Sequence, residues 1–315
     1  MSRLRSPRFW GWVAMLALGI AAPFIVYPVF AMNVLCLALF ASAFNLLLGY
    51  TGLLSFGHAA FLGSAAYVTG YAAKVWGLPT ELAVLAGTAV ATALGAIFGG
   101  LAIRRSGIYF AMITLGFAQM VYFLVVQLPW TGGEDGLQGI PRGKALGYIS
   151  LERPLAMYYF VLVAFLAAFW LIKRAISSPF GHVLRAIREN EPRALSLGYD
   201  VARYKLVAFV LSAGLTGLAG SLKAVVLQFA SLSDVHWHRS GEVVLMTLLG
   251  GMGTVMGPSV GALLVVSLEN YLAEAGSWVT VITGLVFVVS VLAFRRGIVG
   301  EVRAAVKRSF TGGKP

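Results

Sequence analysis

Ser55 and His58 are the two residues of this chain whose types and spacing come closest to nucleophilic chemistry. They lie three positions apart in the stretch GYTGLLSFGH, which joins two long apolar runs. A neighbouring histidine can take the proton of a serine hydroxyl, but such a pair also needs a third group that orients the histidine. No third group stands out in the sequence, so the signal for a membrane-bound enzyme that uses this pair is weak.

The same stretch has a second interpretation, as a helix boundary inside a membrane. Ser55 suits the N-cap of a helix that places His58 in its first turn. Ionisable groups in membrane helices are costly and often functional, so His58 is a candidate substrate contact or gate. The alternative is a neutral histidine that is hydrogen-bonded between two helices. The candidate pathway or gate residues are Asn45, Ser55, Gly57, His58, Gly250, Gly251 and Gly253.

Motifs for catalysis and for cofactors are missing from the sequence. The P-loop pattern G-x-x-x-x-G-K-[ST] does not occur, because Gly143-Lys144 is followed by Ala145. There is no H-E-x-x-H, and with Cys36 as the only cysteine there is no Cys/His cluster for a metal. We therefore expect no metal, no cofactor and no ATP site in this chain, and a function other than catalysis.

The most charged stretch, SPFGHVLRAIRENEPRALSLGYDVARYK, covers residues 178–205 and separates two long apolar runs. Its first half suits a turn and a short helix. Asn190 then suits an N-cap, Pro192 a first helical turn and Gly198 a helix end. A solvated basic loop needs no such start and stop, so the pattern favours a short docking helix over a bare loop.

The composition is typical of a membrane protein. The 315 residues are 59% hydrophobic and 11% charged, whereas soluble domains carry about 25% charged residues. No Lys, Arg, Asp or Glu occurs from Phe9 to Ala73. The net charge of +12 comes from basic residues at the ends of apolar runs, which indicates membrane topology rather than a nucleic-acid-binding face. We therefore expect an all-α polytopic membrane protein.

Several apolar runs approach the length of about 20 residues that a membrane-spanning helix needs. They are Phe9–Tyr27, Ala31–Leu48, Ser55–Ala73, Leu82–Ile103, Ile108–Leu128, Leu155–Ile172, Leu206–Phe229, Glu242–Leu268 and Trp278–Phe294. Nothing between them resembles a soluble domain, so residues 1–315 are expected to form a single transmembrane domain. Its longest polar connections are the loop 129–154 and the charged segment 178–205.

Basic residues predict how the runs are oriented. Three arginines before Phe9 place the N-terminus in the cytoplasm, and alternation then puts segment 178–205 inside and loop 129–154 in the periplasm. Basic residues after Phe294 also place the C-terminus in the cytoplasm. This requires residues 242–268 to cross the membrane an even number of times, or to re-enter from one side.

A glycine-rich bend would supply the extra crossing. The sequence GGMG at 250–253, followed by Gly257-Pro258, can interrupt a membrane helix where protein covers the backbone. We therefore expect a broken or re-entrant pair of short helices near 242–268, and about ten transmembrane segments in total. The alternative is one ordinary span with small residues on a packing face.

Three blocks of this sequence resemble the LivM-type permease subunits of bacterial branched-chain amino acid ABC importers. The blocks are residues 49–61, 180–222 and 250–262, and the similarity runs over nearly the full length. The resemblance implies an ABC importer permease fold in the bacterial inner membrane, with a cytoplasmic coupling helix seated in a groove of the ATPase subunit. Glu191, Ala194 and Gly198 match the family's Glu-Ala-Ala…Gly pattern, whereas Pro192 and Arg193 depart from it.

The resemblance also implies a mechanism and a set of partners. A periplasmic substrate-binding protein would deliver a branched-chain amino acid, and two ATPase subunits that bind ATP and Mg would drive alternating access. A second homologous permease subunit would complete the core, and the pathway would be a transient, mostly uncharged cavity. The residues expected to couple to the ATPase are Arg185, Arg188, Glu189, Asn190, Glu191, Pro192, Arg193, Ala194, Leu195 and Gly198.

Two other transport functions remain open at this point. Related permeases for urea or short amides share these sequence blocks, so the substrate is not fixed by them. A secondary transporter or channel would work without an ATPase. The lack of an acidic residue deep within an apolar run disfavours coupling to protons or sodium.

Overall fold

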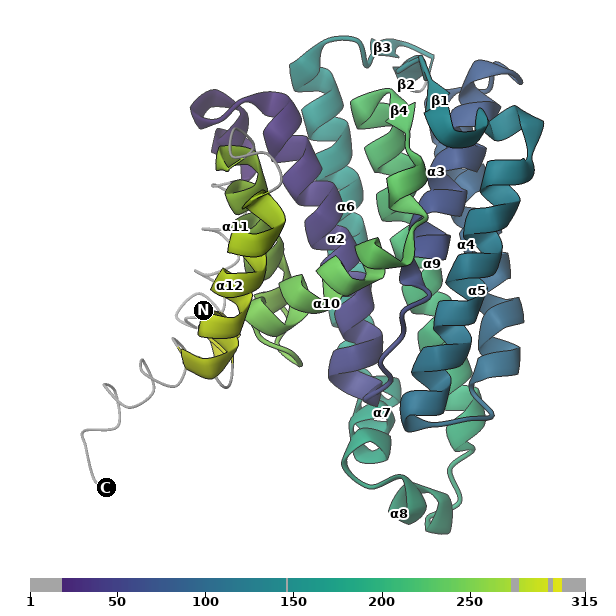
Figure 1. The fold of residues 1–315 in the computed structure, drawn as a ribbon, viewed down its shortest axis with the longest axis vertical. Coiled ribbons are helices and arrows are strands. Elements are labelled where there is room, and N and C mark those ends of the chain that lie inside the picture. The colour runs from purple at the N-terminus through teal and green to yellow at the C-terminus, as the bar shows by residue number, and fades with distance from the viewer. Residues whose placement is uncertain (1–18, 146, 273–277, 294–296, 302–315) are drawn as a thin grey trace, which may run out of the picture.

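The computed structural model describes residues 19–145, 147–272, 278–293 and 297–301, and the fold over these residues is mainly helical (Figure 1). Its helices are α2 (Pro28–Thr51), α3 (His58–Lys74), α4 (Thr80–Ala102), α5 (Gly107–Gln127), α6 (Pro154–Ile176), α7 (Pro179–Glu189), α8 (Glu191–Ser196), α9 (Val201–Leu227), α10 (Trp237–Gly250), α11 (Gly257–Tyr271) and α12 (Trp278–Ala293). The helices α2, α4, α5, α6 and α9 are long and apolar enough to cross a membrane. The predicted all-α polytopic architecture is therefore confirmed. The first predicted run, Phe9–Tyr27, lies mostly outside the described residues, and the total of about ten segments stays a prediction.

Helices α2 and α9 form the centre of the bundle. Within their most apolar windows, 83% of α2 and 72% of α9 is buried, against 33% of α5. Helix α9 packs against α2, α3 and α4, and small residues allow the close approach. A Cβ added at Gly217 would meet the Ala91 side chain of α4, and one at Gly220 would meet the Leu62 carbonyl of α3. These glycines therefore serve helix packing.

Helix α3 begins in the middle of the bundle rather than at its edge (Figure 1). After α2, residues 52–57 run back without helical structure, and α3 starts at His58. The His58 Nε2 atom lies 2.9 Å from the Ser212 hydroxyl, halfway along α9. The same hydroxyl donates to the Ala43 carbonyl of α2 at 2.6 Å. The first turn of α3 therefore lies against the middles of the two central helices.

Helix α10 also begins inside the bundle. Residues 228–236 follow α9 and carry the short strand β4 (Phe229–Ala230) and the 3-10 turn η4 (Leu232–Asp234). The Ala59 amide of α3 donates to the Ser240 hydroxyl of α10 at 2.8 Å, so the first turns of α3 and α10 touch. Two helices shorter than the long spans thus meet at their amino ends, and each contributes partial positive charge there.

The glycine-rich bend separates α10 from α11 and changes the direction of the chain (Figure 1). Gly251 and Gly253 adopt φ angles of 121° and 76°, which favour glycine. A Cβ at Gly250 would collide with the Gly257 carbonyl, so the two helices also pack closely. The expected pair of short helices near 242–268 is confirmed, and one straight span through this region is excluded.

The two longest polar connections lie at opposite ends of the molecule (Figure 1). Loop 129–154 contains the 3-10 turns η2 (Pro129–Thr131) and η3 (Gly133–Asp135) and the strands β1 (Leu137–Gln138), β2 (Lys144–Ala145) and β3 (Ile149–Ser150). Strand β1 pairs antiparallel with β4, and β2 pairs antiparallel with β3. Helices α7 and α8 of the charged segment lie at the other end, as alternating spans require.

Candidate functional site

Helix α8 has the start and the stop that the sequence predicts. The Asn190 side chain caps it by accepting a hydrogen bond from the Arg193 amide at 3.0 Å. Pro192 lies in the first turn, and Gly198, with φ of +85°, follows the helix end. The charged segment therefore contains a short, defined helix rather than a bare loop.

One side of α8 is attached to the body of the protein and the other side is free. Ala194 is buried in a small cluster with Ile187 and Val201. Leu195 and Leu197 are 56% and 68% exposed at the end of the molecule farthest from loop 129–154. Leu195 in the last turn of α8 and Leu197 at its C-cap are exposed apolar side chains that a partner groove can cover.

Three of the predicted coupling residues contact the bundle, although Arg185 and Arg188 stay exposed. Arg188 donates through Nη1 to the Gly49 carbonyl in the last turn of α2. Arg185 places its guanidinium 5.6 Å from the centre of the Tyr50 ring. Glu191 forms an ion pair with Lys205, at 2.6 Å, near the start of α9. These contacts link the charged segment to both central helices.

Asn45 of α2 holds the glycine-rich bend in place. Its Oδ1 atom accepts from the Gly253 amide at 2.9 Å, and its Nδ2 atom donates to the Thr254 carbonyl at 2.8 Å. Arg188 approaches the same point, because a Cβ added at Gly253 would lie 3.2 Å from its Nη1 atom. The structure therefore brings Asn45, Gly253 and the charged segment together at one end of the bundle.

His58 is fully buried and both of its ring nitrogens have partners. Nδ1 lies 3.0 Å from the Ser55 hydroxyl, and Nε2 lies 2.9 Å from the Ser212 hydroxyl. The rings of Phe44 and Phe209 meet the imidazole edge-on at 5.0 and 5.8 Å between centroids. Among the described residues, the hydrogen-bond partners of the ring are both serines, so the geometry fits a neutral histidine that joins helices.

Ser55 has a different local role from the one predicted. Gly57 occupies the N-cap position of α3, and the Ser55 hydroxyl accepts from the Gly57 amide at 3.2 Å. The prediction of Ser55 as N-cap is therefore wrong by two residues, while the placement of His58 in the first turn is confirmed. The candidate pathway residues also divide into two groups, because Ser55, Gly57 and His58 lie at the start of α3, away from the bend.

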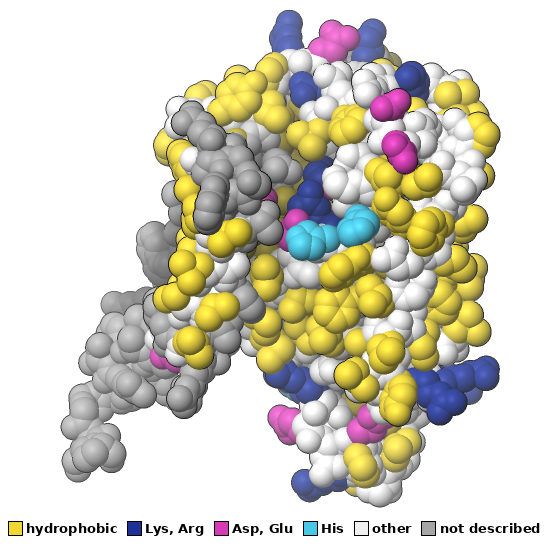
Figure 2. Space-filling view, in the orientation of Figure 1, with side chains coloured by type: hydrophobic (Ala, Val, Ile, Leu, Met, Phe, Trp, Pro, Cys, Tyr) yellow, Lys and Arg dark blue, Asp and Glu magenta, His cyan; other side chains and the backbone are white. Residues whose placement is uncertain are grey.

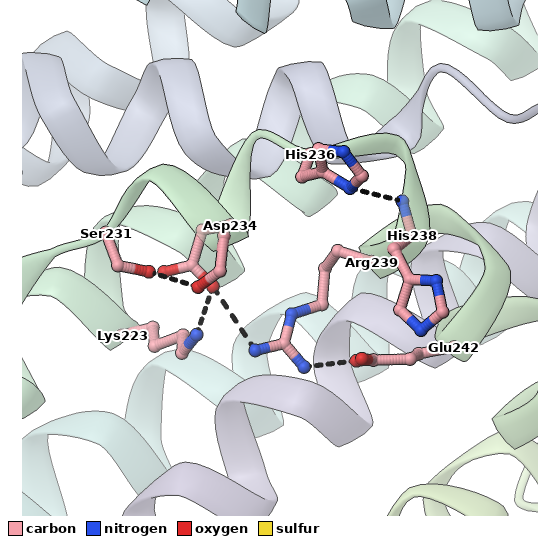
Figure 3. A network of polar contacts seen from close by, with 8 residues as sticks. Lys223, Ser231, Asp234, His236, His238, Arg239 and Glu242 are labelled. Atoms are coloured by element: carbon pink, nitrogen blue, oxygen red, sulfur yellow. Dashed lines mark hydrogen bonds and ion pairs between the residues drawn. The ribbon is translucent and has the colours of Figure 1, made fainter. Parts of the chain in front are cut away.

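A buried network of four charged side chains was not predicted from the sequence (Figure 3). Asp234 pairs with Lys223 of α9 and, at 3.4 Å, with Arg239 of α10. Arg239 also pairs with Glu242 one turn farther along α10. The four side chains are between 5% and 24% exposed.

This network contrasts with the mostly uncharged pathway that the family resemblance implies. The Lys223 ammonium is buried against Asp234, and the two side chains are 8% and 5% exposed. The alternating pattern of runs treats residues 230–241 as a loop outside the membrane. The only sequence signal was the cluster of ionisable residues SDVHWHR at 233–239 directly before an apolar run.

A pocket of about 340 Å³ opens beside the network. It is lined by Tyr122, Leu232, Ser233, His236, His238, Arg239 and Glu242. Figure 2 shows two histidine side chains at the edge of a hollow in which basic and acidic side chains are visible, with apolar surface around it. In the part of the chain that the structure describes, no group of three or more His, Cys, Asp or Glu residues is arranged to hold a metal ion.

Comparisons with known proteins agree on one family. The family model described as "Branched-chain amino acid transport system / permease component" matches residues 29–291. The chain is 26% identical to the high-affinity branched-chain amino acid transport system permease protein LivM of Escherichia coli (strain K12), over 94% of this chain and 76% of that protein. It is 30% identical to the autoinducer 2 import system permease protein LsrC of Klebsiella pneumoniae, over 57% of this chain and 52% of that protein. No solved structure gives a significant match.

Proposed function

This chain belongs to the branched-chain amino acid transport permease family, and on that premise we propose that it is the membrane-spanning subunit of an ABC importer for branched-chain amino acids. The likeness to LivM covers 94% of the chain, and the apolar helices fit a multi-pass inner-membrane protein. Both termini and the segment 178–205 face the cytoplasm in this proposal, and loop 129–154 faces the periplasm.

The observation that carries the proposal is the way the charged segment is attached. Helix α8 presents Leu195 and Leu197 outward, while Glu191 and Arg188 connect the same segment to α9 and α2. A partner that binds the two leucines and moves them would therefore also displace both central helices. This is the arrangement that a coupling element needs, since force must pass from a docking surface into the bundle.

The remaining partners follow from that assignment. ATP and Mg bind to two ATPase subunits and not to this chain, which carries no P-loop sequence. A second homologous permease subunit completes the membrane core, and a periplasmic substrate-binding protein delivers the amino acid. The chain itself acts as a transport subunit without catalytic residues.

Reconstitution of the complete transporter in lipid vesicles tests the proposal. We expect L-leucine uptake that requires ATP, both ATPase subunits and the binding protein. The variants Leu195→Ser and Leu197→Ser should lower uptake and weaken retention of the ATPase subunits, while Leu155→Ser, an exposed leucine on α6, should leave both unchanged. Uptake by this chain without ATPase subunits would instead show a secondary transporter or channel.

The identity of the substrate is tested in the same vesicles. The partial likeness to LsrC supports autoinducer 2 as a second candidate solute, because that relative is named as its import permease. ATP-dependent uptake is measured separately with labelled L-leucine, autoinducer 2 and urea. Uptake of L-leucine that unlabelled L-isoleucine inhibits supports a branched-chain amino acid importer, whereas uptake of autoinducer 2 without uptake of L-leucine supports the second candidate.

A further inference from the structure

The buried charged network divides into a closed half and an open half. Lys223 and Asp234 have side chains that are 8% and 5% exposed, and they satisfy each other. Arg239 and Glu242 are 17% and 24% exposed and both line the pocket. The pocket therefore offers one cation and one anion side by side, and Arg239 also contacts Asp234 of the more deeply buried ion pair.

The rest of the pocket suits a small polar ligand with an apolar part. Tyr122, Ser233, His236 and His238 bring groups that donate or accept hydrogen bonds, and Leu232 adds an apolar wall. The first turn of α10 lies at the pocket and adds the partial positive charge of a helix amino end. The volume of about 340 Å³ lies at the small end of the range for ligand sites, about 300–1,000 Å³.

We propose that this pocket binds the zwitterionic head group of the amino acid as it crosses the membrane. Glu242 receives the α-ammonium group, while Arg239 and the amino end of α10 receive the α-carboxylate. This inference rests on the proposed function and adds a substrate site to it. It replaces the expected uncharged pathway with a site that carries opposite charges in balance.

The proposed site keeps its charges balanced whether it is empty or occupied. Lys223 and Arg239 offset Asp234 and Glu242, so the network has no formal net charge. Without ligand, Arg239 and Glu242 pair with each other, which avoids the high cost of a buried unpaired charge. A zwitterion exchanges that pair for two new ones and leaves the net charge unchanged. A neutral solute such as urea has no charges with which to replace the ion pair, so the site discriminates against it.

Protection of a thiol in the pocket tests where the amino acid binds. The variant His238→Cys places an accessible thiol on the pocket wall, and the native Cys36 is buried. In the purified full transporter, saturating L-leucine should slow labelling of this thiol by about tenfold. L-Leucinamide, 4-methylpentanoate and urea should not, because each lacks one or both charges. Tyr148→Cys, a highly exposed position at the end of the molecule that carries loop 129–154, serves as the control that no ligand protects.

The second test measures transport by variants in which the charged side chains of the pocket are replaced. Glu242→Gln and Arg239→Lys should lower L-leucine uptake about tenfold, while stimulation of ATP hydrolysis by the loaded binding protein persists. The matched control is Glu269→Gln, which removes a carboxylate whose charge also acts on Arg239 but which does not line the pocket. Its uptake should equal that of the unaltered protein.

The outcomes distinguish a failure of the zwitterion site from a failure of the proposed function. Equal uptake by Glu242→Gln and Glu269→Gln, or labelling of His238→Cys that L-leucine does not slow, overturns the zwitterion site. If the unaltered transporter shows no ATP-dependent uptake of any amino acid, the proposed function itself fails. If the charge variants do not assemble, the labelling of His238→Cys decides the question, since that variant leaves the network intact.

Discussion

Arg188 of α7 donates from its guanidinium to the main-chain carbonyl of Gly49, in the last turn of α2. The two residues are 139 positions apart in the chain, and the contact lies beside the Gly253 bend that Asn45 holds. The Arg188 side chain thus connects the charged segment to a central helix, next to the break between α10 and α11. Movement of the charged segment therefore has a direct route to the residues that interrupt the bundle.

Replacing Arg188 tests this route. Arg188→Ala removes the hydrogen bond to Gly49 but leaves the outward face of α8 intact, so the ATPase subunits should still bind. We expect ATP hydrolysis to persist while L-leucine uptake falls about tenfold. Parallel measurement of hydrolysis and uptake in vesicles gives the coupling ratio. Arg203→Ala is the control, because Arg203 is 85% exposed at the same end of the molecule and pairs with Asp200 on the surface.

A second prediction concerns the ion pair between Glu191 and Lys205. The Lys205 side chain is 5% exposed and that of Glu191 is 39% exposed, so Glu191→Gln leaves a nearly buried ammonium without its charge partner. Because Glu191 is partly hydrated, we expect a loss of about 1–3 kcal/mol in unfolding free energy. Thermal unfolding of the purified chain measures it.

The exposed pair of Asp200 and Arg203 is the matched comparison. Asp200→Asn also weakens an ion pair near the start of α9, but the side chains there are 50% and 85% exposed. Exposed pairs contribute about 0–1 kcal/mol, so its unfolding temperature should change less. If both variants show the same change in unfolding temperature, the Glu191–Lys205 pair contributes no more to stability than an exposed ion pair.

The local signals in the sequence predict the ends of α8 well, although the N-cap predicted at Ser55 for α3 is wrong by two residues. Asn190, Pro192 and Gly198 mark α8 correctly, because capping depends on residues within one turn. The bend at 250–257 is also correct, since glycines permit φ angles that other residues resist. These features depend on neighbours along the chain, which the sequence shows directly.

Local signals could not predict that α3 and α10 begin inside the bundle. Whether Ser240 meets Ala59, or Lys223 meets Asp234, depends on how helices far apart in sequence pack together. Hydropathy shows the length of each apolar run but not whether the chain turns back into the bundle between runs. The charged network was therefore missed, because its members fall in a connection and at the ends of runs.

A third prediction separates a structural His58 from a gate. His58→Ala removes a buried ring and leaves the Ser55 hydroxyl without its imidazole partner. We expect a loss of about 2–4 kcal/mol in unfolding free energy. The fraction that still assembles should transport at the unaltered rate for each complex. A variant that keeps its unfolding temperature but loses transport would instead identify His58 as part of the pathway.

The last prediction concerns Asn45, whose amide makes both hydrogen bonds to the bend. Asn45→Ala leaves the Gly253 amide and the Thr254 carbonyl without these partners, so the bend should open more often. Hydrogen exchange measured by mass spectrometry should then show faster exchange in residues 251–256, together with a lower coupling ratio. The coupling ratio falls because the bend opens, and not because the ATPase binds less well. Retention of the ATPase subunits should therefore not change.

Ser42→Ala provides the comparison for Asn45→Ala. Ser42 lies one turn earlier on α2, and its hydroxyl meets that of Ser259 in α11 at 3.2 Å, so its removal touches α11 but spares the bend. Exchange in residues 251–256 should stay as in the unaltered chain. Faster exchange in both variants would mean that the α2–α11 contact as a whole, and not the Asn45 amide, holds the bend. Unchanged exchange in both would show that the glycine conformations hold the bend without help from α2.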